Sequence, residues 1–177
     1  ERLIGSWSSP MCETRPDGQG GFLYLKRHFQ FAADSTWSGI FAFYTDDTCT
    51  TPVSSVDISG GYALGGPSAR VYDAIEAEFE LATVVVTAHI DFFADYLNSA
   101  EPGACGSKTW VVGEAQDISE TGCLLIGVDH DSCPVEHEVV HLAGQQLYFG
   151  ARPQDGGNLC TPERRPMALQ TAMIRAE

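Results

Sequence analysis

Residues 23–49 constrain the fold more than any other part of the sequence, because apolar and polar side chains alternate along them in two arms. The apolar face of the two arms carries Leu23, Leu25, Phe29, Phe31, Trp37, Gly39, Phe41 and Phe43. A pleated strand sends successive side chains to opposite faces, whereas a helix would scatter these aromatics around its axis. Since the connection Ala33-Asp34-Ser35 is short and turn-forming, we predict a β-hairpin. An aromatic face of this length needs a sheet or barrel to cover it, which predicts an all-β domain.

The length and composition are those of a single packed domain over residues 1–177. Of the 177 residues, 44% are hydrophobic and 10% aromatic, enough to bury a substantial core. No apolar run approaches the length needed to cross a bilayer, so we expect no membrane span. The opening residues, ERLIGSWSSP, contain no apolar leader, and we expect any secretory signal to have been removed. The net charge of −14 would repel a polyphosphate, which argues against a nucleic-acid partner.

An even number of cysteines indicates disulfide bonds. The six are Cys12, Cys49, Cys105, Cys123, Cys133 and Cys160. None belongs to a Cys-x-x-Cys pair, the spacing that metal fingers and redox motifs need. Disulfides persist in oxidising compartments, so we expect an extracellular protein, either secreted or associated with a surface. Six cysteines allow about fifteen pairings, and the sequence alone leaves the choice among them open.

The remainder of the chain shows further short strands separated by turns. We predict one strand around Trp7 and others over residues 53–64, 69–81, 84–86, 110–116, 123–129, 138–142, 145–150 and 168–176. Within the second of these, Gly60-Gly61 indicates a bulge or a close approach by another backbone. Many consecutive strands with tight turns are most simply accommodated by closure. The predicted architecture is therefore a single antiparallel β-barrel or half-barrel.

One segment, Asp91–Asn98, predicts a short helix within this β domain. Its sequence is DFFADYLN, and Asp91 is a residue type that caps helix N-termini. The apolar side chains Phe92, Phe93, Tyr96 and Leu97 share one side of such a helix.

The apolar face of the hairpin and two later strands form the candidate ligand-binding wall. Its residues are Phe29, Phe31, Trp37, Phe41, Phe43, Phe79 and Val86. In a narrow barrel such side chains fill the interior, whereas in a wider barrel they line a cavity. The sequence leaves both alternatives open, because it does not give the number of strands in the barrel.

The strongest signal for an enzyme is the segment His137-Glu138-Val139-Val140-His141. On a helix its two histidines could hold zinc while the glutamate acts as a base. The β-branched pair between them and Pro134 just upstream instead favour a strand. On a strand, residues four apart lie about 13 Å apart, too far for one zinc ion to bridge. We therefore predict that the protein is not an enzyme and has no catalytic residue. A zinc metalloprotease is the least favoured alternative.

Two weaker constellations have ordinary structural explanations. The cluster Asp129, His130, Asp131 and His137 could bind a cation, but a polar turn is the favoured interpretation, and we predict no metal site and no cofactor. The pairs Arg15-Pro16 and Arg152-Pro153 favour arginines that stack over an aromatic ring or pair with Asp to fix a corner, with ligand binding as the alternative.

Several segments together resemble the adenomatosis polyposis coli down-regulated family, whose animal members are secreted or membrane-tethered Wnt antagonists. The similar segments include GSWSSPMCETRP, FLYLKRHFQF, STWSGIFAFYTDDTCTTP and LYFGARPQDGG, and the order is kept over essentially the whole chain. The chain is most similar to the second of the two domains in the animal proteins. The resemblance implies a disulfide-bonded antiparallel barrel, with Cys12 joined to Cys49 and Cys105 to Cys123. The remaining two cysteines, Cys133 and Cys160, would most simply bridge each other.

The resemblance also implies a function. The barrel of the family has an apolar pocket that takes a lipid chain, such as the acyl group on Wnt. We therefore expect a secreted, non-enzymatic binding module that holds a lipid or a lipidated protein and contacts other extracellular proteins. The alternative is a structural module of an extracellular or cell-surface assembly, in which the barrel is filled and only its outside matters.

Overall fold

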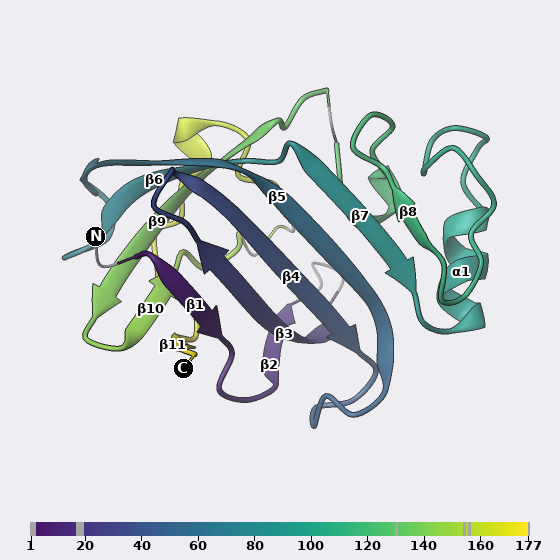
Figure 1. Ribbon diagram of the computed structural model, residues 1–177, viewed down its shortest axis with the longest axis horizontal. Helices are drawn as coiled ribbons and strands as arrows, with labels where there is room; N and C mark the ends of the chain where they lie inside the picture. The colour runs from purple at the N-terminus through teal and green to yellow at the C-terminus, as the bar shows by residue number, and fades with distance from the viewer. Residues whose placement is uncertain (1–2, 17–19, 130, 154, 156, 177) are drawn as a thin grey trace.

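The computed structural model describes residues 3–16, 20–129, 131–153, 155 and 157–176, and these fold into a β-barrel with an extension on one side (Figure 1). The strands are β1 (Gly5–Ser8), β2 (Glu13–Pro16), β3 (Phe22–Phe31), β4 (Thr36–Tyr44), β5 (Pro52–Pro67), β6 (Ile75–Glu80), β7 (Thr83–Ala88), β8 (Ala115–Asp117), β9 (Val135–Ala143), β10 (Gln146–Phe149) and β11 (Met173–Arg175). The helices are α1 (Asp91–Asn98) and the two 3-10 turns η1 (Leu124–Ile126) and η2 (Pro162–Arg164).

Eight of these strands close the barrel through antiparallel hydrogen bonds. The order around the ring is β3, β1, β11, β10, β9, β6, β5 and β4, and β4 returns to β3. The predicted hairpin is confirmed, because β3 and β4 pair from Tyr24 opposite Tyr44 to Phe31 opposite Trp37. The ring closes where the first strand meets the last, with Trp7 opposite Arg175. The all-β barrel predicted from the sequence is therefore present.

Strand β5 is the longest strand and belongs to both parts of the molecule. Along one edge it pairs with β4, whereas its other edge pairs first with β7 and then, from Tyr62 onward, with β6. The change of partner occurs at Gly60, where a Cβ atom would lie 2.3 Å from the carbonyl oxygen of Glu80. Only glycine allows the two backbones to come so close. The predicted close approach at Gly60-Gly61 is thus confirmed.

The barrel core is built largely from aromatic side chains. Its buried members are Leu3, Trp7, Phe29, Phe31, Trp37, Ala77, Phe79, Val140, Leu147, Phe149 and Met173. Gly39 on β4 leaves room for this packing, because a Cβ atom there would lie 2.8 Å from the rings of both Phe29 and Trp37. Because Gly39 has no side chain, the rings on either side of it can interdigitate.

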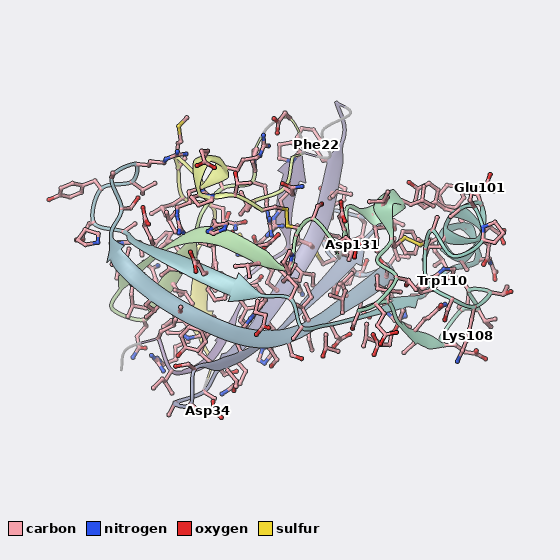
Figure 2. The ribbon with its side chains drawn as sticks, turned by 90° about the horizontal axis from the view of Figure 1, so that it is seen from above. Phe22, Asp34, Glu101, Lys108, Trp110 and Asp131 are labelled. Carbon is pink, nitrogen blue, oxygen red and sulfur yellow. A yellow bond between two sulfur atoms is a disulfide. The ribbon has the colours of Figure 1, made fainter. Side chains whose placement is uncertain are left out.

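The extension has a second, smaller core between β7 and the segment that contains α1. Its buried members are Val84, Val86, Ala88, Ala94, Leu97, Cys105, Trp110, Ile118 and Cys123. Trp110 donates from its indole Nε1 to the carbonyl oxygen of Cys105 at 2.9 Å. Figure 2 shows Glu101, Lys108 and Trp110 at one end of the molecule, away from the hairpin turn at Asp34. We call β7, β8, α1 and residues 99–128 the extension.

The three disulfides join the two pairs that the family resemblance implied and the remaining pair expected to bridge each other. Cys12 is bonded to Cys49, Cys105 to Cys123 and Cys133 to Cys160, and all six cysteines are used. The first bond ties the segment before β2 to the corner after β4, the second lies within the extension, and the third joins the residue Cys133 before β9 to Cys160 between β10 and η2.

Several predicted elements differ from those observed. The strand predicted over 69–81 begins only at Ile75, because residues 68–74 form the turn that connects β5 to β6. The strand predicted over 110–116 is reduced to β8. In the segment 123–129, residues 124–126 form the 3-10 turn η1, held by the N–H of Gly127 bonding to the carbonyl of Leu124. The last predicted strand, 168–176, is reduced to β11. Strand β2 was not predicted.

The helix has the predicted bounds, but only part of its apolar side is buried. Ala94 and Leu97 are buried, whereas Phe92 is 79% exposed and Tyr96 is also exposed. The N-cap position is Ile90 and makes no side-chain cap hydrogen bond, so Asp91 begins the helix rather than capping it. In the described part of the chain no helix has both the length and the apolar composition of a membrane-crossing segment.

Candidate functional site

Four residues of the predicted ligand-binding wall lie deep in the barrel. Phe29, Phe31, Trp37 and Phe79 are buried in the barrel core. The ring centroid of Phe29 lies 5.9 Å from that of Trp37 and 5.1 Å from that of Phe149, both edge to face. This geometry is favourable for aromatic pairs. The deep half of the barrel is therefore filled by its own side chains.

The other three predicted wall residues lie elsewhere. Phe41 and Phe43 point to the same side of β4 as Trp37 but are only partly buried. Val86 is fully buried in the core of the extension, so it does not line the space near Phe79. It shares a face of the sheet with Phe41 through Val56, which lies opposite both residues. The seven predicted residues thus form one sheet face but not one cavity.

Arg27 faces the barrel interior, a position that the sequence analysis did not assign. Its Nε and Nη2 atoms each donate to the carboxylate of Glu13 at 2.9 Å, and Nη2 also donates to the carbonyl oxygen of Thr171 at 2.8 Å. The two charged side chains are 1% and 2% exposed. The alternation through Leu25 and Phe29 places residue 27 on this face, so the signal was present in the sequence.

Strand β9 sends two further carboxylates toward the same space. The guanidinium of Arg152 donates to both oxygens of Glu136, at 2.7 and 2.8 Å. Glu138 is buried, and its Oε2 atom accepts hydrogen bonds from the backbone N–H groups of Val139 and Gly150, each at 3.1 Å. Burial raises the pKa of Glu138 to about 7, although the nearby Arg152 guanidinium opposes the shift.

Arg15 on β2 completes the charged set. Its guanidinium carbon lies 5.8 Å from the ring centroid of Phe41, which confirms the predicted stacking of this arginine over an aromatic ring. The Nε atom is buried, and no described residue accepts a hydrogen bond from it. Burial lowers the pKa of Arg15 to about 9, and the positive charges of Arg152 and Arg27 add to the effect, whereas the carboxylates of Glu13 and Glu138 oppose it. We call Arg15, Arg27, Glu136, Glu138 and Arg152 the charged mouth.

The charged mouth and the aromatic residues below it enclose a cavity of about 20 Å³. The aromatic floor of this cavity is formed by Phe29, Trp37, Phe41, Phe79 and Phe149. A cavity of this size holds about one water-sized group. The site therefore joins an apolar wall to a cluster of buried charges, with little empty space between them.

A larger hollow, about 170 Å³, lies on the extension and is lined by residues 107–109, 111 and 114–117. The side chain of Gln116 already uses its polar atoms there. Its Oε1 atom accepts from the N–H groups of Ser107 and Lys108, and its Nε2 atom donates to the Lys108 carbonyl oxygen at 3.3 Å. The polar atoms of Gln116 beside this hollow are therefore already hydrogen-bonded within a turn next to the edge strand β8.

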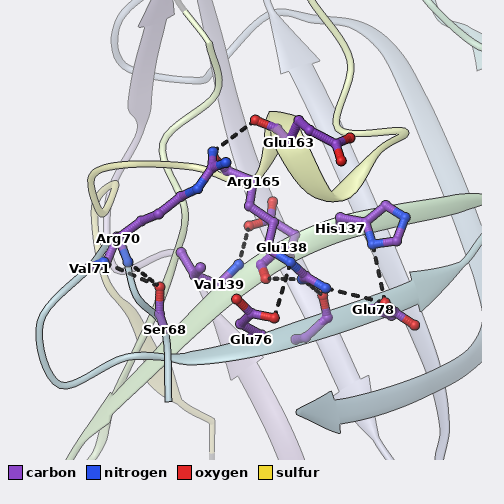
Figure 3. A network of polar contacts seen from close by, with 11 residues as sticks. Ser68, Arg70, Val71, Glu76, Glu78, His137, Glu138, Val139, Glu163 and Arg165 are labelled. Carbon is purple, nitrogen blue, oxygen red and sulfur yellow. Dashed lines mark hydrogen bonds and ion pairs between the residues drawn. The ribbon is translucent and has the colours of Figure 1, made fainter. Parts of the chain in front are cut away.

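The His-Glu-x-x-His segment forms part of strand β9, as the β-branched residues indicated. His137 lies on the outside of the barrel with its Nδ1 atom 3.2 Å from Glu78 (Figure 3). The Nδ1 atom of His141 lies 2.6 Å from the carbonyl oxygen of Asp73. Glu138 points to the opposite, inner side. The strand thus separates the glutamate from both histidines and gives each histidine a different partner.

Arg165 fixes β6 against β9 beside these histidines (Figure 3). Its Nη1 atom donates to the carbonyl oxygens of Ala77 and Glu138 at 2.8 and 2.9 Å, and the guanidinium also approaches the carboxylates of Glu76 and Glu78. The outer carboxylates of β6 are therefore partly neutralised by a structural arginine.

The candidate cation cluster is only partly within the described residues, because His130 lies outside them. Asp129 accepts a hydrogen bond from the N–H of Ser132 at 3.1 Å, as in a polar turn. Over the described ranges, no group of three or more His, Cys, Asp or Glu side chains is arranged to hold a metal ion.

A comparison with protein families gives one match over nearly the whole chain. Residues 1–172 match the family model described as adenomatosis polyposis coli down-regulated 1. The matched range includes every strand of the barrel except the last, and it includes the whole charged mouth.

Proposed function

We propose, because this chain belongs to the adenomatosis polyposis coli down-regulated family, that it is an extracellular, non-enzymatic binding module whose barrel takes an apolar chain. Three disulfides that use every cysteine support an oxidising compartment. The ligand is a lipid or the lipid group of an acylated protein, in line with the Wnt-antagonist-like character of the family. The open end of the β3–β4 hairpin supplies most of the contact surface.

The observation that carries this proposal is the decrease in burial along the inner face of β4, together with the exposed Leu23 near the start of β3, next to the fully buried Leu25. Phe31 and Trp37, at the turn end, are sealed in the core, whereas Phe43 and Leu23, at the opposite end, are partly open to solvent. Leu23 is 43% exposed although it lies on the apolar face. An apolar strip that leads from solvent to a filled core favours binding of another apolar group.

A specific observation also favours the structural module as a second candidate. The cavity above the aromatic floor is about 20 Å³, whereas ligand pockets are commonly about 300–1,000 Å³. A guest chain must therefore lie along the open end of the strip or displace Phe41 and Phe43. If these side chains do not move, the barrel remains filled and only its outer surface acts.

Uptake of a fluorescent fatty acid, together with native mass spectrometry, separates the two candidates. We expect saturable binding by the wild-type protein, and each methylene that the ligand buries contributes about 0.8 kcal/mol. Phe43→Ala should weaken binding and keep a cooperative melting transition, because Phe43 is only partly buried. Phe41→Asp should abolish uptake, since it replaces an aromatic part of the wall by a carboxylate beside the Arg15 guanidinium, where it competes with the ligand.

Phe22→Ala is the matched control, because Phe22 lies on the outer face of β3 and is 63% exposed. Its uptake should equal that of the wild type. If the wild-type protein carries no lipid and shows no saturable uptake, the carrier function is wrong and the structural module replaces it.

A further inference from the structure

The charged mouth contains three arginines, and carboxylates of the described residues pair with only two of them. Arg27 is bonded to Glu13 and Arg152 to Glu136, each through two hydrogen bonds. Arg15 differs from both, since no described residue forms an ion pair with it or accepts a hydrogen bond from its buried Nε atom. A buried donor without an acceptor is destabilising, and a buried guanidinium more so. An acceptor supplied by a ligand would satisfy this donor.

Glu138 is the remaining carboxylate at the mouth, and it does not neutralise Arg15 fully. Its Oε2 atom is engaged by the backbone N–H groups of Val139 and Gly150 rather than by a guanidinium. Its raised pKa, about 7, leaves a large protonated fraction at neutral pH, whereas Arg15, with a pKa of about 9, stays mainly charged. The mouth therefore carries local positive charge in a protein whose net charge is −14.

The position of Arg15 relative to the apolar strip defines the shape of a complementary ligand. Arg15 lies opposite Leu23 in the β2–β3 pairing, and the next inward pair along the hairpin is Leu25 opposite Phe43. The guanidinium stacks over Phe41 and lines the cavity of about 20 Å³. That cavity has room for one oxygen atom of an anion beside Nε. A negative group at one end of an apolar chain satisfies both surfaces at once.

We propose that Arg15 binds the carboxylate of a free fatty acid whose chain lies along the strip formed by Leu23, Phe41 and Phe43. The inference rests on the proposed function and specifies its ligand as an acid rather than an ester. The Nε atom donates a charge-assisted hydrogen bond to one oxygen of the carboxylate, and the neutral carbonyl of an ester accepts a weaker one.

Paired titrations with dodecanoic acid and methyl dodecanoate test the inference. The two probes have the same alkyl chain, so the affinity of both depends on the apolar strip, whereas only the affinity of the acid depends on Arg15. We expect the wild-type protein to bind the acid at least about tenfold more tightly than the ester, as a hydrogen bond to a charged group implies. Arg15→Met should reduce the affinity for the acid to that for the ester and leave the ester affinity unchanged.

Arg164→Met is the matched control, because Arg164 pairs with Asp155 on the surface. This variant should keep the wild-type preference for the acid. If the wild-type protein binds acid and ester equally, the carboxylate site is wrong and the proposed function stands. If it binds neither probe, both are wrong.

Thermal unfolding of the ligand-free protein supplies a readout that does not depend on binding. Methionine keeps the length of the arginine stem and its contact with Phe41 but removes the unpaired charge, so Arg15→Met should raise the melting temperature. If the variant melts at a lower temperature than the wild type, Arg15 has a structural partner and the inference is wrong.

Discussion

The barrel and the extension share strand β5 and one face of the sheet, yet different interactions hold each of them. In the barrel, the hydrogen-bonded ring returns to its starting strand, and an aromatic core fills the inside. In the extension, β7 and β8 form an open edge, and the disulfide between Cys105 and Cys123 lies in the core. Asn98 adds two hydrogen bonds to the backbone of Trp110, at 2.7 and 3.0 Å. In the extension, where the hydrogen-bonded strands do not close into a ring, the disulfide and side-chain hydrogen bonds hold the segments together.

Polar groups are also treated differently in the two regions. The barrel buries Glu13, Arg27 and Glu138 next to aromatic rings, whereas the buried side chains of the extension core are apolar apart from Gln116. Buried charges stabilise a fold only when each has its partner. The barrel is therefore the region in which single polar substitutions should have large effects, and the extension is the region in which covalent closure should matter.

The largest effect should follow from breaking the buried ion pair. Glu13→Gln leaves the charge of Arg27 unpaired inside the barrel and should destabilise the protein by about 3–5 kcal/mol in chemical denaturation. Asp155→Asn breaks an exposed pair with Arg164 and should cost less than about 1 kcal/mol. Equal losses in the two variants would contradict the distinction between buried and exposed pairs.

Removal of the extension disulfide should give a smaller and local effect. Replacing both Cys105 and Cys123 by serine opens a loop with a sequence separation of 18, for which about 3 kcal/mol is expected. Hydrogen exchange should show loss of protection in α1 and residues 105–128, with the barrel amides retained. If the protection of β3 and β4 falls equally, the two regions unfold as one unit.

The smallest of the three effects should appear as a pH dependence confined to the barrel. The pKa of Glu138 is about 7 in the folded protein, above its ordinary value of 4.5, because of burial. Between these values the folded state retains a proton that the unfolded chain releases, so stability falls as pH rises through this window, by at most about 3 kcal/mol.

The stability difference between the wild type and Glu138→Gln, measured from pH 4.5 to 8, isolates this group. Glutamine cannot release a proton, so the variant should lose less stability than the wild type as the pH rises. Glu101→Gln, at an exposed position, should follow the wild-type curve. A pH dependence that is identical in the wild type and in Glu138→Gln would contradict the assignment.

Much of the barrel could be predicted from the sequence, and little of the extension could. Strict alternation over β3 and β4 left only one pairing that buries the aromatic face, so the hairpin was predictable. Residues 110–114 and 123–126 have strand-like compositions, but their backbones bond within turns and around the disulfide. Such local hydrogen bonds depend on which segments meet in space, and periodicity does not record that.

The candidate site was predictable in its apolar half alone. Phe29, Trp37 and Phe79 lie together because residues of one face of a sheet remain neighbours after closure. The position of Arg27 follows from the same alternation, although its partner on β2 does not, since β2 was not predicted. Arg15 as an unpaired cation could not be deduced, because the sequence offers 24 acidic residues as partners.

The pairing of Trp7 with Arg175 has a kinetic consequence. The barrel ring lacks strand β11 until the segment around Arg175 has left the ribosome, whereas the β3–β4 hairpin emerges much earlier. Contacts between residues so distant in the chain form slowly, since the loop entropy is lost before the contact is gained. During that interval the inner face of the hairpin, with its phenylalanines, is exposed. Biogenesis of this domain therefore depends on how well a nascent, unclosed sheet is shielded from aggregation.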